Sequence, residues 1–117
     1  MNAQDLQQRT KKFSLQIILF FQGLPKTTEA QLLGKQLLRA ATSVAANYRA
    51  ACRGRSKAEF IAKLSIVVEE ADETLLWLEL MEEAGIASVE ESLKKEAKEI
   101  LFIMSASRKS AKGRDNQ

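Results

Sequence analysis

The 117-residue sequence contains no histidine and a single cysteine, Cys52. Histidine is the commonest general base and the commonest metal ligand in proteins, and structural zinc sites are built from cysteine and histidine. Carboxylate di-metal bundles also use histidines, in a Glu-x-x-His arrangement. We therefore expect no catalytic residues, no metal and no cofactor, and we interpret the protein as non-enzymatic.

Glycine and proline are also scarce, with five glycines and one proline. This is few for a β-rich fold with many tight turns. Gly34 and Gly54 are isolated from other glycines, so no glycine-rich phosphate-binding loop is present. Cys52 alone cannot form an intramolecular disulfide. Its helical neighbours are mostly apolar, which favours an inert buried thiol over a reactive one.

Long hydrophobic runs are absent. Apolar runs such as 17–21 are far shorter than the ~20 residues that a membrane-spanning helix needs. Residues 1–12 are polar and contain no apolar signal-peptide core. We therefore expect a soluble, cytoplasmic protein without membrane contact. The net charge of +3 permits a polyanionic partner without requiring one.

Helical periodicity and helix-boundary signals predict four helices. The first is expected from about Asp5 to Gln22 and the second from Thr28 to the Arg53–Arg55 segment. The third is expected from Ser56 to about Ala84, with Gly85 as its C′ residue. The fourth follows 88–91, and capping-box patterns mark the starts of the last three helices. The apolar stripe of the fourth helix ends near Met104.

The short connections between these helices favour antiparallel neighbours. The sequence thus predicts an all-α fold, an antiparallel up-down-up-down four-helix bundle, as one domain spanning residues 1–117. Residues from about 105 to 117 are polar and basic and are expected to form a frayed tail. The basic residues of this tail are Arg108, Lys109, Lys112 and Arg114.

The third helix carries a dense group of carboxylates, whose directions scatter around its non-core arc rather than converging. They are Glu69, Glu70, Asp72, Glu73, Glu79, Glu82 and Glu83. A solvated or salt-bridged face is the favoured interpretation. A metal or catalytic site and a partner-binding role remain alternatives.

The second helix carries a row of cations, which we call the basic stripe. At about 100° per residue, Lys35, Arg39, Arg49 and Arg53 fall within roughly 80°, opposite the apolar stripe of this helix. Arg55 in the following turn extends the row. One interpretation is a solvated face paired with the acids of the third helix. The other is a surface that follows the phosphates of RNA or DNA, and without interleaved aromatic residues its binding would be led by the backbone.

The first and third helices have more apolar surface than a bundle core requires. Ile66, Trp77 and Leu80 lie opposite the core stripe of the third helix. Leu15, Ile18 and Leu19 form a similar surplus on the first. Trp77 could cap the edge of the bundle, but we favour a subunit interface and symmetric self-association, because large apolar patches rarely stay exposed.

Residues 34–47 carry a family resemblance, together with Arg49, Arg55-Ser56, Glu59-Phe60 and the run 70–79. The sequence resembles the bacterial four-helix bundle family named for proteins encoded in 23S ribosomal RNA intervening sequences, from Phe13 to about Met104. The resemblance implies a bundle that assembles into a ring, commonly a pentamer, with no established enzymatic activity.

A related branch, the accessory proteins of diversity-generating retroelements, is similar to this chain in fold. Those proteins are basic, bind nucleic acid and associate with a reverse transcriptase. The resemblance would place phosphate contacts on the basic stripe: Lys35, Arg39, Arg49, Arg53 and Arg55. Two functions stay open: a homo-oligomer that binds RNA or DNA, and a protein–protein adaptor whose basic face meets an acidic partner or a neighbouring subunit.

Overall fold

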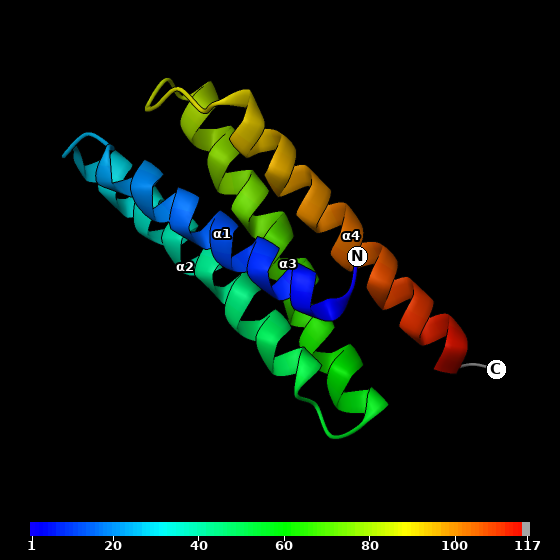
Figure 1. The fold of residues 1–117 in the computed structure, drawn as a ribbon. Helices are drawn as coiled ribbons and strands as arrows, with labels where there is room; N and C mark the ends of the chain where they lie inside the picture. The colour runs from blue at the N-terminus through cyan, green and yellow to red at the C-terminus, as the bar shows by residue number, and fades with distance from the viewer. Residues whose placement is uncertain (116–117) are drawn as a thin grey trace.

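The computed structural model describes the backbone of residues 1–115 and the side chains of residues 1–113. The described chain folds into four helices: α1 (Ala3–Gln22), α2 (Thr28–Cys52), α3 (Lys57–Glu83) and α4 (Glu91–Asp115). They form an elongated antiparallel bundle of 50 × 23 × 21 Å (Figure 1). Each helix packs on the next one in the chain, and α1 touches α4 more lightly. The predicted up-down-up-down bundle is confirmed.

Helix α1 begins with a reciprocal capping box between Asn2 and Asp5 and ends at the predicted Gln22, with Gly23 as its C-cap. Helix α2 begins one residue away from the predicted cap. The hydroxyl of Thr27, not Thr28, accepts the Ala30 N–H at 3.3 Å. The adjacent threonines offer the same chemistry, which is why the sequence pattern alone did not separate them.

Helix α3 has the predicted cap, because the Ser56 hydroxyl accepts the Glu59 N–H at 3.1 Å. The Glu59 carboxylate reaches back to the N–H of Arg55 at 2.7 Å. At the other end Gly85 has a φ of 71°, and the N–H groups of Gly85 and Ile86 donate to Glu82 and Met81 at 3.1 and 2.9 Å. This is the Schellman arrangement that a glycine at C′ allows.

Helix α4 differs from the prediction at both ends. It begins at Glu91 rather than at the Ser88 box, and the N–H groups of Leu93 and Lys94 both donate to the carbonyl of Glu90, at 3.0 and 3.1 Å. It then continues to Asp115, through most of the expected tail. Ala111 is buried there, so this segment packs on the bundle. Residues 116–117 of the expected tail lie outside the described residues.

The core is formed by apolar side chains from all four helices. Its largest fully buried side chains come from every helix: Phe13, Ile17, Leu37, Val44, Leu64, Val67, Leu78, Met81, Ile100 and Met104. The Ser14 hydroxyl on α1 hydrogen-bonds the carbonyl of Ala41 on α2 at 3.3 Å. Such a contact needs close backbones, which small residues such as the buried Ala40 and Ala41 permit.

Gly34 is a second point of close approach. A Cβ placed there would lie 2.6 Å from Cδ1 of Leu24 and 2.9 Å from Cδ1 of Phe21. The absence of a side chain at Gly34 therefore lets the end of α1 and the α1–α2 connection close over α2. Together with Ala40 and Ala41, it gives residues 34–47 a packing role.

Candidate nucleic-acid interface

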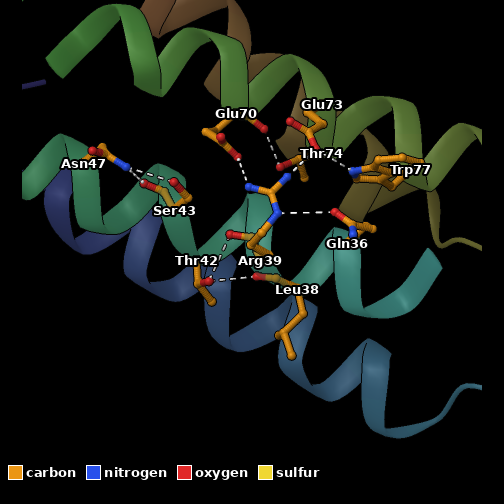
Figure 2. Close-up of polar contacts among 10 residues, drawn as sticks. All are labelled: Gln36, Leu38, Arg39, Thr42, Ser43, Asn47, Glu70, Glu73, Thr74 and Trp77. Carbon is orange, nitrogen blue, oxygen red and sulfur yellow. Dashed lines mark hydrogen bonds and ion pairs between the residues drawn. The ribbon is translucent and has the colours of Figure 1, made fainter. Parts of the chain in front are cut away.

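The structure divides the basic stripe into two parts. Arg39 reaches across to α3, where its guanidinium binds the carboxylates of Glu70 at 3.0 Å and of Glu73 (Figure 2). Its Nε also donates to Gln36 at 3.3 Å. Partial desolvation opposes the charged form, but the hydrogen bond to Glu73 and the charge of Glu70 raise the pKa of Arg39 above its ordinary value. This part of the stripe is paired with the acids of α3.

Two further ion-pair groups tie helices together. Arg9 on α1 binds Glu96 at 2.7 Å and Glu99 at 2.5 Å, both on α4, and the hydrogen bond to Glu96 is the largest cause of its raised pKa. Lys94 on α4 binds Glu82 of α3 at 2.8 Å. Five carboxylates therefore bind cations of neighbouring helices in the same chain: Glu70, Glu73, Glu82, Glu96 and Glu99.

The other residues of the stripe are exposed and differently placed. Lys35, Arg49, Arg53 and Arg55 make no ion pair within the described part of the chain. The three arginines lie at the end of α2 and in the α2–α3 turn, whereas Lys35 lies several turns away. The structure thus brings Arg49, Arg53 and Arg55 together and separates them from Lys35.

The α2–α3 turn and the C-terminal part of α4 lie at the same end of the bundle (Figure 1), and this end is rich in cations. We call it the basic end. Its cations are Arg49, Arg53, Arg55, Lys57, Lys63, Arg108, Lys109 and Lys112. The opposite end contains the α1–α2 and α3–α4 connections and carries Glu29, Glu79, Glu82, Glu83, Glu90 and Glu91. The net charge of +3 is therefore the sum of one end rich in cations and an opposite end rich in carboxylates.

A hollow of about 280 Å³ lies at the basic end. Arg53, Arg55 and Lys63 contribute cations to its lining, and Glu59 contributes a carboxylate. The first turn of α3 adds the partial positive charge of a helix N-terminus. Glu59 partly offsets this charge through its hydrogen bonds to the turn, so the cations around it determine the sign of the surface.

The apolar residues predicted for an interface are divided between two surfaces. On α3, Ile66 and Leu80 are exposed, and Trp77 is half-buried with its indole N–H donating to Glu73 at 3.2 Å. On α1, Leu15 and Leu19 are exposed and Ile18 is half-buried. Because α1 and α3 lie diagonally across the bundle, the two sets do not form one patch.

Two exposed apolar residues escaped the sequence reasoning. Leu32 on α2 is 61% exposed and Phe102 on α4 is 75% exposed. Leu32 precedes Arg39 by seven residues, and Leu80 follows Glu73 by seven. Since α2 and α3 are antiparallel, both leucines lie about 10 Å from the Arg39–Glu73 pair in the same direction, which extends the apolar surface of α3 onto α2. The seven-residue spacing from Leu32 to Arg39 was the sequence signal that places Leu32 on this surface.

A close group of metal-ligating side chains would be one sign of a catalytic site. In the part of the chain that it describes, no three His, Cys, Asp or Glu side chains group closely enough to hold a metal ion. Cys52 is half-buried, and its neighbour Tyr48 has a pKa raised first by burial and then by Cys52.

No helix within residues 1–115 has both the length and the apolarity needed to cross a membrane.

The fold and this surface define an all-α, antiparallel four-helix bundle with one strongly basic end. Comparison with known proteins then identifies the chain as a member of the 23S rRNA-intervening sequence protein family, whose sequence pattern matches residues 2–106. The family resemblance of the sequence is thereby confirmed.

A solved structure shares this fold. It is described as a protein of unknown function from the S23 ribosomal protein family of Bacteroides thetaiotaomicron VPI-5482. The two chains are 32% identical and superpose with a TM-score of 0.84, over 93% of this chain and 99% of the other. No curated protein matches the sequence. Membership therefore establishes the fold, and the family is one of unknown function that is not known to be enzymatic.

Proposed function

We propose that this protein is a non-enzymatic, homo-oligomeric bundle that binds the phosphate backbone of RNA or DNA through its basic end. The single observation that supports this proposal is that Arg49, Arg53 and Arg55 stay exposed and without ion pairs among the described residues, while Arg39 is paired with acids. Unpaired arginines at one end of a charge-separated bundle match the surface that a polyphosphate requires.

The geometry also changes which residues should contact phosphate. Arg39 would have to break its contacts with Glu70 and Glu73 before it could bind a phosphate. Lys63 lines the same hollow as Arg53 and Arg55, and Lys109 and Lys112 lie near the C-terminus of α4 at the basic end; all three join the proposed surface. Lys35 contributes at its margin.

Self-association is supported by the apolar surface shared by α2 and α3, formed by Leu32, Ile66, Trp77 and Leu80. Aromatic side chains such as Trp77 are enriched in interface cores, and large exposed apolar patches mark interaction sites. The α1 set, with Leu15 and Leu19 exposed, is a second apolar surface on a different side. Two different surfaces suit a heterologous contact that closes into a ring, such as the pentamer that the resemblance implies.

The test is charge reversal at the basic end. Arg49→Glu combined with Arg53→Glu should weaken binding to a labelled RNA or DNA by more than tenfold at low salt, since several phosphate contacts are lost. Lys26→Glu makes the same kind of change at the opposite, acidic end and should leave affinity nearly unchanged. Absence of binding by the wild-type protein at low salt would overturn the proposal.

A second candidate function is a protein–protein adaptor. Arg39 of the basic stripe binds two carboxylates of α3. The exposed arginines of the basic end are able to bind the carboxylates of an acidic partner in the same way, such as a surface of a reverse transcriptase or a neighbouring subunit. If a neighbouring subunit is the partner, the double reversal should lower the mass measured by light scattering. An unchanged oligomer with lost RNA or DNA binding favours the first function.

A further inference from the structure

The outer face of α4 presents an exposed aromatic residue. Phe102 is 75% exposed, although it lies in the middle of a helix whose neighbouring residues Ile100 and Met104 are buried in the core. A hollow of about 560 Å³ lies beside it, lined also by Lys95, Lys98, Glu99 and Ile103. Phe102 therefore forms an apolar surface that a planar group can reach from solvent.

Lysines flank Phe102 on both sides along the helix. Lys95 precedes Phe102 by seven residues and Lys109 follows it by seven. Each lysine therefore lies about 10 Å from Phe102 along the helix axis and points within about 20° of the same direction. Lys98 lies one turn before it, offset by about 40°. All three lysines are exposed and form no ion pair with another residue whose side chain the structure describes.

The acidic neighbour on this face is already compensated. Glu99 binds the guanidinium of Arg9 at 2.5 Å, and the same Arg9 holds Glu96 at 2.7 Å. The pairing leaves the positive charge of the three lysines on the outer face of α4. The face is thus a row of cations interrupted by one exposed aromatic ring.

We propose that this face binds single-stranded nucleic acid, with a base stacked on Phe102 and phosphates contacted by Lys95, Lys98 and Lys109. Exposed aromatic rings between cations are the platform on which unpaired bases stack. A duplex keeps its base faces covered, so the surface discriminates in favour of single strands. The inference rests on the proposed function and adds the substrate class: an unpaired strand rather than a duplex.

A second copy of the chain is the competing occupant of this face. A symmetric contact through Phe102 would bring the lysines of both copies together, and charged residues are depleted from interface cores. The flanking cations therefore favour a polyanion. This alternative becomes an outcome of the experiment below.

The experiment measures fluorescence anisotropy of a labelled uridine oligonucleotide of about 20 nucleotides and of an RNA duplex of the same length. It compares the wild-type protein with Phe102→Ala, Phe102→Tyr and the control Leu76→Ala, which removes an exposed apolar side chain of α3 that belongs to none of the proposed surfaces. Phe102→Ala should bind the single strand about five- to a hundredfold more weakly. Phe102→Tyr should retain the wild-type affinity. The single-strand affinity of Leu76→Ala and the duplex affinity of every variant should stay unchanged.

Single-strand binding that is unaltered in Phe102→Ala would overturn the inference while leaving the proposed function intact. A lower oligomer mass of Phe102→Ala in light scattering would overturn it in favour of a subunit contact. If the wild-type protein binds neither oligonucleotide at low salt, the proposed function itself fails. Circular dichroism of each variant shows that the bundle is still folded.

Discussion

The guanidinium of Arg39 on α2 binds the carboxylate of Glu73 on α3, and that same carboxylate accepts the indole N–H of Trp77 at 3.2 Å (Figure 2). Glu70, one turn earlier on α3, accepts a second hydrogen bond from Arg39 at 3.0 Å. This group joins the two central helices of the chain on their outer face. It also explains why Arg39 differs from the other cations of the basic stripe.

Arg39→Met should lower the free energy of unfolding by about 0.5–1 kcal/mol, because a half-exposed ion-pair network contributes modestly. A double-mutant cycle with Glu73→Gln, measured by urea denaturation, should give a coupling energy of a few tenths of a kcal/mol or more. Lys35→Met, one turn earlier on the same face, is the matched control and should stay within about 0.5 kcal/mol of wild type. Equal effects of the Arg39 and Lys35 substitutions would contradict the pairing.

Gly34→Ala should destabilise the bundle although alanine favours helix formation. The new Cβ would lie 2.6 Å from Leu24 and 2.9 Å from Phe21, and overpacking of this kind costs about 1–3 kcal/mol, more than the ~1 kcal/mol gained in helix propensity. Gly113→Ala on α4 is the control, since no atom lies within 4 Å of its added Cβ. It should be neutral or stabilising in thermal denaturation, and a stabilising Gly34→Ala would refute the close approach.

Leu32→Glu and Leu80→Glu should each reduce the oligomer mass measured by light scattering while the helical circular dichroism stays constant. Both side chains are exposed, so a charge there opposes association rather than folding. Trp77→Glu should do the same, but its half-buried ring also packs on the core and the variant can unfold. Leu15→Glu and Leu19→Glu test the α1 surface separately. Unchanged mass in all of these variants would exclude both surfaces as interfaces.

Ala111→Asp should lower the free energy of unfolding by about 1–3 kcal/mol, because it places an unpaired charge at a buried position. Ser110→Asp, at the exposed neighbouring position, carries the same unfavourable charge near the end of α4 and serves as the control. Equal chemical-denaturation midpoints for the two variants would support the frayed tail that the sequence predicts.

Features that depend on a few neighbouring residues could be predicted from the sequence. The Ser56 cap and the Gly85 turn were correct because short hydrogen-bonded motifs determine them. The end of α4 was not foreseen, because Ala111 continues the heptad of Met104 with a side chain too small to mark a core position. Phe102 was missed because residues 100–104 are all apolar, and their sequence does not show which one faces outward.

The candidate site was predicted only as a set of directions on one helix. Helical periodicity places Arg39 and Arg53 on the same face, but it contains no information about how α2 and α3 are aligned. That alignment brings Glu70 and Glu73 opposite Arg39 and leaves Arg53 exposed. The separation of paired from unpaired arginines therefore required the tertiary structure.

The most direct test of the proposed function is the salt dependence of binding to a single-stranded RNA. The logarithm of the binding constant falls with the logarithm of salt concentration by about 0.7 for each phosphate neutralised. Replacing Arg49, Arg53 and Arg55 together with glutamine should therefore reduce the magnitude of the slope by about 2, whereas Arg39→Gln should leave it nearly unchanged. Equal slopes for the triple variant and the wild type, or a slope that changes only in Arg39→Gln, would contradict phosphate binding at the basic end.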